Sequence, residues 1–274
     1  MRYFLELGYN GAGFHGWQRQ PNAVSVQQTI EENLTTLLRR PTPLTGAGRT
    51  DAGVHARQMY AHFDTEEPIA NERSFLLSLN RMCGRGIAFS RLIPVGDEAH
   101  ARFDATRRMY KYFVLGEKSP FLYPYSWHSP SPLDVEAMNA AAARLLEVED
   151  FTSFAKLHSD AKTNICKVDT AVWTPYECEL GLPAKGLVFT IAADRFLRNM
   201  VRAVVGTLVD VGRGKLTEEG FMKIVEGKDR CMAGTSMPPE ALFLWNVEYP
   251  LQLFVYQRLN LFLKKRHVID DYTP

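Results

Sequence analysis

The sequence lacks long hydrophobic runs. Its 274 residues contain no stretch approaching the ~20 consecutive apolar residues of a membrane-spanning helix, which argues against an integral membrane protein. Near the N-terminus, Glu6 stands where a secretory signal peptide would have its apolar stretch. We therefore expect a cytoplasmic protein that has no membrane partner.

Cysteine is scarce and shows no metal-binding pattern. The chain has four cysteines, with neither a CxxC pair nor zinc-ligand spacing among them: Cys83, Cys166, Cys178 and Cys231. This spacing argues against a disulfide-stabilised or zinc-containing domain and is typical of reduced thiols in a cytosolic protein.

A strong excess of positive charge is also absent. The net charge is only +1, whereas proteins that coat nucleic acid are usually strongly basic. Any binding of RNA must therefore depend on local basic patches.

The apolar pattern of the first half predicts a β-α-β-β-α-β order. The first helix has Ser25 as its N-cap with Gln28 three residues later, a capping-box pair. Strands are predicted over residues 2–9, 42–47, 57–64 and 87–95, with helices following Ser25 and over residues 71–80.

The second half repeats this order more loosely. Strands are predicted over residues 109–115, 168–174, 187–193 and 242–249, with helices opened by Ser131 and Pro132, over 196–211, and over 217–227. Two such units predict an α+β fold of two ferredoxin-like (RRM-like) domains, residues 1–104 and 105–274, with mainly antiparallel sheets. No Gly/Ser linker separates them, so we expect sheets joined edge to edge around a central cleft.

A glycine-rich loop between two predicted strands stands out. It reads GAGRTDAGVHA over residues 46–56, with three glycines around Arg49 and Asp51. It does not fit the dinucleotide-binding fingerprint, because Asp51 takes the place of the third glycine and no helix follows. It does not fit a P-loop either, since no Gly-Lys-Ser/Thr follows.

Two interpretations of Asp51 remain open from the pattern alone. The carboxylate can belong to a structural turn that is stabilised by a salt bridge. Alternatively, the glycines admit a bulky ligand, and an arginine keeps the carboxylate ionised so that it attacks an electrophilic carbon. A lone carboxylate fits the two-carboxylate scheme of glycosidases poorly.

Three arginines lie near the start of the predicted helix over residues 196–211. Arg195, Arg198 and Arg202 are spaced three and four apart, so they would share one helix face. That face is either a solvated basic surface or a site for an anion. We expect Arg202 to reach Asp51 while Arg195 or Arg198 faces phosphate or solvent.

The segment GRTDAGVHA at residues 48–56 closely resembles the catalytic signature of the TruA family of tRNA pseudouridine synthases. Further segments resemble that family's other motifs in the same order: YNGAGFHGWQRQ at 9–20, HARFDAT at 100–106, YKY at 110–112, DFTSF at 150–154, MVR at 200–202 and the strand over 242–250. The resemblance covers nearly the whole chain.

The resemblance implies a reaction and its residues. Asp51 matches the nucleophile, which attacks either the base or C1′ of the ribose before uracil reattaches through C5. Tyr110 matches the tyrosine that stacks on the target base, although its pattern alone favours a core aromatic on a strand. Arg202 matches the arginine that pairs with the catalytic carboxylate. Neither a metal nor an organic cofactor is implied.

The resemblance also implies tRNA as the substrate, modification of the anticodon stem-loop at positions 38 to 40, and a homodimer. His55 is expected to brace the loop, and Arg49 either to brace it or to bind phosphate. The other expected RNA contacts are Gln18, Arg19, Arg57, Arg195 and Arg198, and further basic candidates are Arg107, Arg108, Lys111, Lys156 and Lys162.

Two competing functions make different predictions. A non-catalytic RNA-binding protein with tandem RRM-like domains would carry RNP-type aromatic motifs, and none of the expected K/R-G-F/Y form is present. A hydrolytic nucleoside enzyme that uses Asp51 would release free base, whereas a synthase would not.

Overall fold

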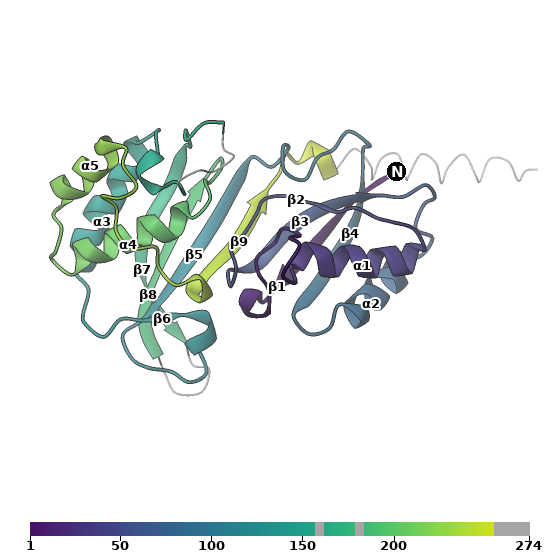
Figure 1. The fold of residues 1–274 in the computed structure, drawn as a ribbon, viewed down its shortest axis with the longest axis horizontal. Coiled ribbons are helices and arrows are strands. Elements are labelled where there is room, and N and C mark those ends of the chain that lie inside the picture. Colours follow the sequence, from purple (N-terminus) through teal and green to yellow (C-terminus); the bar gives the residue numbers. More distant parts are fainter. Residues whose placement is uncertain (157–161, 179–183, 255–274) are drawn as a thin grey trace, which may run out of the picture.

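The structure is a computed structural model that describes residues 1–156, 162–178 and 184–254. These residues form one nine-stranded, mostly antiparallel sheet with helices packed against it (Figure 1). Its main order is β4-β1-β3-β9-β5-β8-β7, with β2 paired to β3 and β6 paired to β5. The predicted α+β class and the mainly antiparallel strand pairing are confirmed. The basic segment at residues 264–267 lies outside the described residues.

The N-terminal half follows the predicted order closely. Ser25 accepts a hydrogen bond from the Gln28 N–H at 3.2 Å, which confirms the predicted cap. The strand predicted over 42–47 is reduced to two residues, after which the chain leaves the sheet as a long loop. The elements are β1 (Arg2–Tyr9), α1 (Val26–Leu38), β2 (Thr45–Gly46), β3 (His55–Asp64), α2 (Glu72–Met82) and β4 (Ile87–Val95).

The C-terminal half differs from the prediction at two helix starts. The third helix begins after Asp134, whose side chain accepts from the Ala137 N–H at 2.9 Å, and not at Ser131. The elements are β5 (Arg107–Leu115), β6 (Trp127–His128), α3 (Val135–Arg144), β7 (Val168–Cys178), β8 (Ala184–Ala193), α4 (Met200–Gly212), α5 (Glu218–Gly227) and β9 (Leu242–Glu248).

The start of α4 corrects the prediction for the arginines. Asn199 has a φ of 67°, in the left-handed region, so the helix cannot extend back through it. Only Arg202 therefore lies on α4, and the expectation that all three arginines share one helix face was wrong. Arg195 and Arg198 lie in the connection that follows β8.

The last strand joins the two halves. β9 lies between β3 and β5, parallel to the first and antiparallel to the second. In Figure 1 it crosses the middle of the molecule, with α1 and α2 on one side and α3, α4 and α5 on the other. Within the described ranges, no helix is long and apolar enough to span a bilayer.

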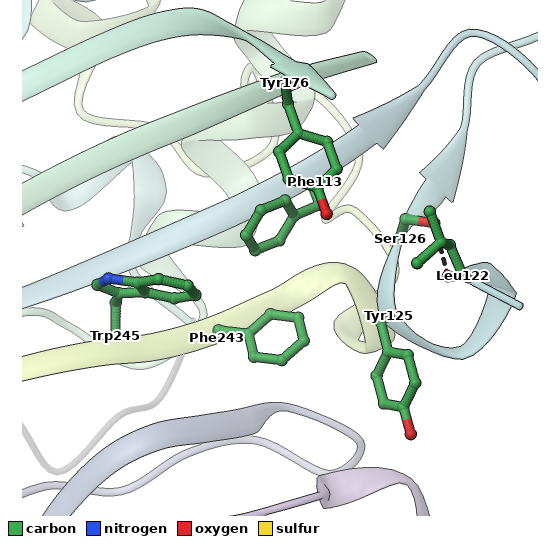
Figure 2. A pocket seen from close by; sticks show the side chains of 7 residues that line it. All are labelled: Phe113, Leu122, Tyr125, Ser126, Tyr176, Phe243 and Trp245. Carbon is green, nitrogen blue, oxygen red and sulfur yellow. Dashed lines mark hydrogen bonds between the residues drawn. The ribbon is translucent and has the colours of Figure 1, made fainter. Parts of the chain in front are cut away.

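The two faces of the sheet differ in what covers them. Tyr110 and Tyr112 pack into the cores beneath the helices, whereas the alternate residues of β5, Lys111 and Phe113, point to the opposite face. There, Phe113, Phe243 and Trp245 help to line an open apolar pocket of about 210 Å³ (Figure 2). The helix-covered face therefore contributes tyrosines to the buried cores, whereas the open face presents aromatic side chains around a pocket.

A buried imidazole holds the turn between β4 and β5. His62 accepts a hydrogen bond from the Ala101 N–H at 3.1 Å, and its ring lies against that of His100. Burial, and then the positive charge of Arg2, lower the pKa of His62 to about 4. The neutral imidazole is therefore the form that fits the folded protein.

We predict that His62 makes the fold acid-sensitive. Its folded-state pKa lies below the ordinary value near 6.5, so its contribution to stability is complete above about pH 6.5 and is lost as the pH falls toward about 4. Urea unfolding of His62→Gln, which keeps an acceptor for Ala101, should show a smaller loss of stability over this range than the wild type. Equal losses would contradict the prediction.

Candidate active site

The Asp51 loop, residues 47–54, connects β2 to β3 and rests on the segment that follows β1. The Trp17 N–H donates to the Thr50 carbonyl at 3.1 Å, and the Gly53 N–H donates to the Phe14 carbonyl at 3.3 Å. The hydroxyls of Tyr9 and Thr50 lie 2.9 Å apart. These bonds make the two sequence motifs one structural unit, in which Thr50 is bonded through both its carbonyl and its hydroxyl.

Glycine is required in this unit because other parts of the chain approach closely. Gly16 has a φ of 87°, and a Cβ there would lie 2.6 Å from the Thr50 carbonyl oxygen. Gly53 has a φ of 80°, and a Cβ there would lie 2.9 Å from the ring of Pro239. At Gly53 the requirement thus comes from packing within the protein and not from a ligand. A Cβ at Gly48 would meet no atom within 4 Å.

His55 braces the end of the Asp51 loop, as the sequence predicted. Its Nδ1 accepts from the Gly11 N–H at 3.0 Å, so its Nε2 donates to the Glu240 carbonyl, also at 3.0 Å. Burial lowers the pKa of the ring, which favours this neutral form. The imidazole thereby links the N-terminal motif to the 3-10 turn Pro239–Ala241 of the other half.

Asp51 pairs with Arg202 across the junction of the two halves. Arg202 Nη1 lies 3.3 Å from Asp51 Oδ2, so the predicted contact is confirmed. Both side chains are about one-fifth exposed, at 20% for Asp51 and 19% for Arg202. Arg202 is itself held by a 2.6 Å hydrogen bond from its Nε to the Met237 carbonyl. The pair therefore presents a partly shielded carboxylate beside a fixed guanidinium.

A second arginine approaches the same carboxylate from outside. Arg198 Nε lies 3.7 Å from Asp51 Oδ1, and its side chain is 62% exposed. Each carboxylate oxygen thus faces a different guanidinium. The sequence analysis expected Arg195 or Arg198 to face phosphate or solvent and did not anticipate this contact.

Tyr110 lies within electrostatic reach of Asp51. Burial and then the negative charge of Asp51 raise the pKa of its phenol, which stays protonated at neutral pH. Its ring packs edge-on against Phe196, with centroids 5.1 Å apart, and contacts the cores of both halves. Tyr110 is therefore both a packing residue and a neighbour of the carboxylate.

Arg108 positions the site, a role that sequence analysis missed. Its guanidinium donates to four backbone carbonyls: Ala105 and Asp194 at 2.7 Å, Arg102 at 2.6 Å and Ala47 at 3.3 Å. These bonds tie the turn before β5, the connection after β8 and the start of the Asp51 loop together. Its place two residues before Tyr110, on the same strand face, is the signal in the sequence.

Arg107 and Arg57 have partners other than Asp51. Arg107 pairs with Asp169 at 2.6 Å and with Glu248 at 2.9 Å. Arg57 lies over the Trp245 ring at 4.9 Å, and Lys111 lies over it at 4.4 Å. Because Lys111 alternates with Tyr110 along β5, this cluster lies on the opposite face of the sheet from Tyr110.

A register shift explains where Arg57 points. Leu7 pairs with Met59 and Tyr9 with Ala56, so two steps along β1 match three along β3. Such a bulge changes which face the following side chains occupy. Arg57 therefore lies on the open face of the sheet, and its role as an RNA contact stays a prediction.

The remaining RNA-contact candidates are accessible. Arg19 forms a 3.3 Å ion pair with Glu31, and Arg195 is half-buried in the connection after β8. The exposed candidates are Gln18, Arg19, Arg49, Lys156 and Lys162. In the part of the chain that the structure describes, no group of three or more His, Cys, Asp or Glu side chains could hold a metal ion.

Comparisons with known proteins agree with one class of enzyme. A model of the tRNA pseudouridine synthase family matches residues 141–250, which include Arg202 but not Asp51. The chain is 56% identical to tRNA pseudouridine synthase A of Parabacteroides distasonis over 253 residues, which cover 92% of this chain and 98% of that protein.

Two further relatives bear the same name. That of Bacteroides thetaiotaomicron is 54% identical over 92% of each chain, and that of Exiguobacterium sibiricum is 36% identical over 91% of this chain and 97% of its own. The fold, the site and these matches define an RNA-modifying isomerase. Within that class, the chain belongs to the TruA family of tRNA pseudouridine synthases.

Proposed function

We propose that the protein isomerises uridine to pseudouridine in the anticodon stem-loop of tRNA, at positions 38 to 40, with Asp51 as the nucleophile. The observation that carries this proposal is the 3.3 Å pair between Asp51 and Arg202, a partly shielded carboxylate held by a guanidinium from the other half of the chain. A carboxylate held beside a guanidinium in this way is positioned to attack an electrophilic carbon.

The proposed reaction conserves every atom. Asp51 adds to the uracil base or to C1′ of the ribose, and the bond between N1 and C1′ breaks. The uracil rotates, C5 bonds to C1′, and the bond to Asp51 breaks, which regenerates the carboxylate. The C5 proton leaves, and N1 acquires a proton. Arg202 holds the carboxylate in place, and Tyr110 stacks on the extruded base. None of these steps needs an oxidant, a metal or a cofactor.

We also propose that residues 1–104 and 105–274 are two ferredoxin-like domains. The strands lie in the order β4-β1-β3-β2 in one half and, leaving the two-residue β6 aside, β9-β5-β8-β7 in the other. In each half the fourth strand along the chain lies beside the first, followed by the third and then the second.

The homodimer and the cytoplasmic location stay predictions. The mass of the purified protein in solution, by light scattering, tests the first.

Mapping the product tests the proposed substrate position. Purified protein is incubated with unmodified tRNA, without added metal or cofactor, and pseudouridine is located by chemical probing of the RNA. Modification within positions 38 to 40 supports the proposal. Modification only outside the anticodon stem-loop would contradict the assigned position, and release of free uracil would indicate hydrolysis instead of isomerisation.

The role of Tyr110 can be separated from simple packing. A stacked aromatic contributes about 1–3 kcal/mol per base, so Tyr110→Leu should lower kcat/KM by roughly 5- to 150-fold, while Tyr110→Phe keeps the stacking. Tyr112→Phe, in the adjacent core position, is the matched control. If Tyr110→Phe were as defective as Tyr110→Leu, the hydroxyl and not the ring face would carry the effect.

A further inference from the structure

Asp51 is contacted by two arginines that differ in how firmly they are held. Arg202 is 19% exposed, approaches Oδ2 at 3.3 Å, and is fixed by the Met237 carbonyl. Arg198 is 62% exposed and approaches Oδ1 at 3.7 Å, beyond hydrogen-bond range. Within the described residues, its guanidinium has no other partner. The inner arginine is thus anchored, and the outer one is not.

The backbone at Arg198 is nonetheless well fixed. Its carbonyl accepts a hydrogen bond from the Lys156 N–H at 3.1 Å, and the left-handed Asn199 follows at the start of α4. Movement of Arg198 would therefore be confined to its long side chain. Exposed ion pairs contribute little stability, so this pair is easily exchanged for another anion.

The contact also obstructs the proposed reaction. Oδ2 is engaged by Arg202, which leaves Oδ1 as the oxygen available for attack, and Arg198 stands beside Oδ1. The RNA that enters the site carries phosphates, whose geometry a guanidinium matches well. Arg198 is thus positioned to pair with the Asp51 carboxylate and, after RNA binds, with a phosphate.

We propose that Arg198 is a transferable counter-ion. In the free enzyme it pairs with Oδ1 of Asp51, and on RNA binding it moves to a backbone phosphate next to the target nucleotide. The transfer uncovers Oδ1 only when substrate is present. This inference rests on the proposed role of Asp51 as the nucleophile.

A double-mutant cycle tests the transfer through binding alone. The dissociation constant for unmodified tRNA is measured for the wild type, Asp51→Asn, Arg198→Gln and the double variant. In Asp51→Asn the guanidinium is already released, so Arg198→Gln should weaken binding there at least about 5-fold more than it does in the wild type. Arg195→Gln, three residues earlier, is the matched control and should weaken binding equally in both backgrounds.

The other outcomes overturn the proposal. Equal weakening by Arg198→Gln in both backgrounds means that the arginine binds phosphate without sharing itself with Asp51. No weakening in either background means that it serves Asp51 alone. Thermal unfolding confirms that each variant is folded. The proposed function fails in a different measurement, since an active Asp51→Asn enzyme refutes the nucleophile whatever the cycle shows.

Discussion

Replacing Asp51 by asparagine should reduce pseudouridine formation in tRNA by at least about 10⁴-fold, because the amide cannot act as the nucleophile. The change is nearly isosteric and removes no hydrogen bond from the loop backbone, so the fold should be retained. Binding of tRNA should persist, since phosphate contacts supply most of the affinity. Single-turnover assays with saturating enzyme measure the chemical step directly.

Asp210→Asn is the matched control. This residue lies on α4, on the same helix as Arg202, and forms a weak 3.9 Å pair with Lys215. It removes the same charge without touching the site, so activity should stay within about 2-fold of the wild type, as for most surface substitutions. Substantial activity of Asp51→Asn would exclude this carboxylate as the nucleophile.

Removing the guanidinium of Arg202 should produce the second-largest loss. Arg202→Met leaves the Asp51 carboxylate without its inner partner and the Met237 carbonyl without its donor. Breaking one side of a partly buried charge pair costs about 2–5 kcal/mol, so kcat should fall by roughly 30- to 5,000-fold. The loss should appear mainly in kcat, because Arg202 contacts the carboxylate and not the solvent-facing surface.

Arg202→Lys distinguishes charge from geometry. A lysine keeps the positive charge but lacks the planar fork that lets Arg202 bind Met237 and Asp51 together, so it should restore only part of the activity. Arg213→Met, just after α4 and over the Trp127 ring, removes a charge away from the site as the control. Near-normal kcat in Arg202→Met would show that the pair is not needed for the chemistry.

Features encoded by neighbouring residues were predictable from sequence. The Ser25 cap depends on an interaction within three positions. The strand over residues 2–9 was recognisable because its pattern of apolar and polar residues is local. The contact between Asp51 and Arg202 was also predicted, although 151 positions separate the two residues, because a family resemblance supplied that pairing.

Features that depend on distant contacts were not predictable. The bulge that turns Arg57 to the open face arises from pairing between β1 and β3, and no local signal marks it. The four carbonyls around Arg108 come from separate parts of the chain, so a basic residue was taken for an RNA contact. The helix start at Asn199 depends on one left-handed residue inside an apolar pattern.

The central place of β9 affects how the protein is made. During synthesis on the ribosome, residues 242–248 emerge after all the other strands, so the adjoining edges of β3 and β5 stay unpaired until then. Unpaired strand edges are prone to aggregation. One of the two strands concerned, β3, begins immediately after the Asp51 loop. A nascent chain that stops before β9 therefore lacks the strand that joins the half carrying Asp51 to the half carrying Arg202, and we expect it to be inactive.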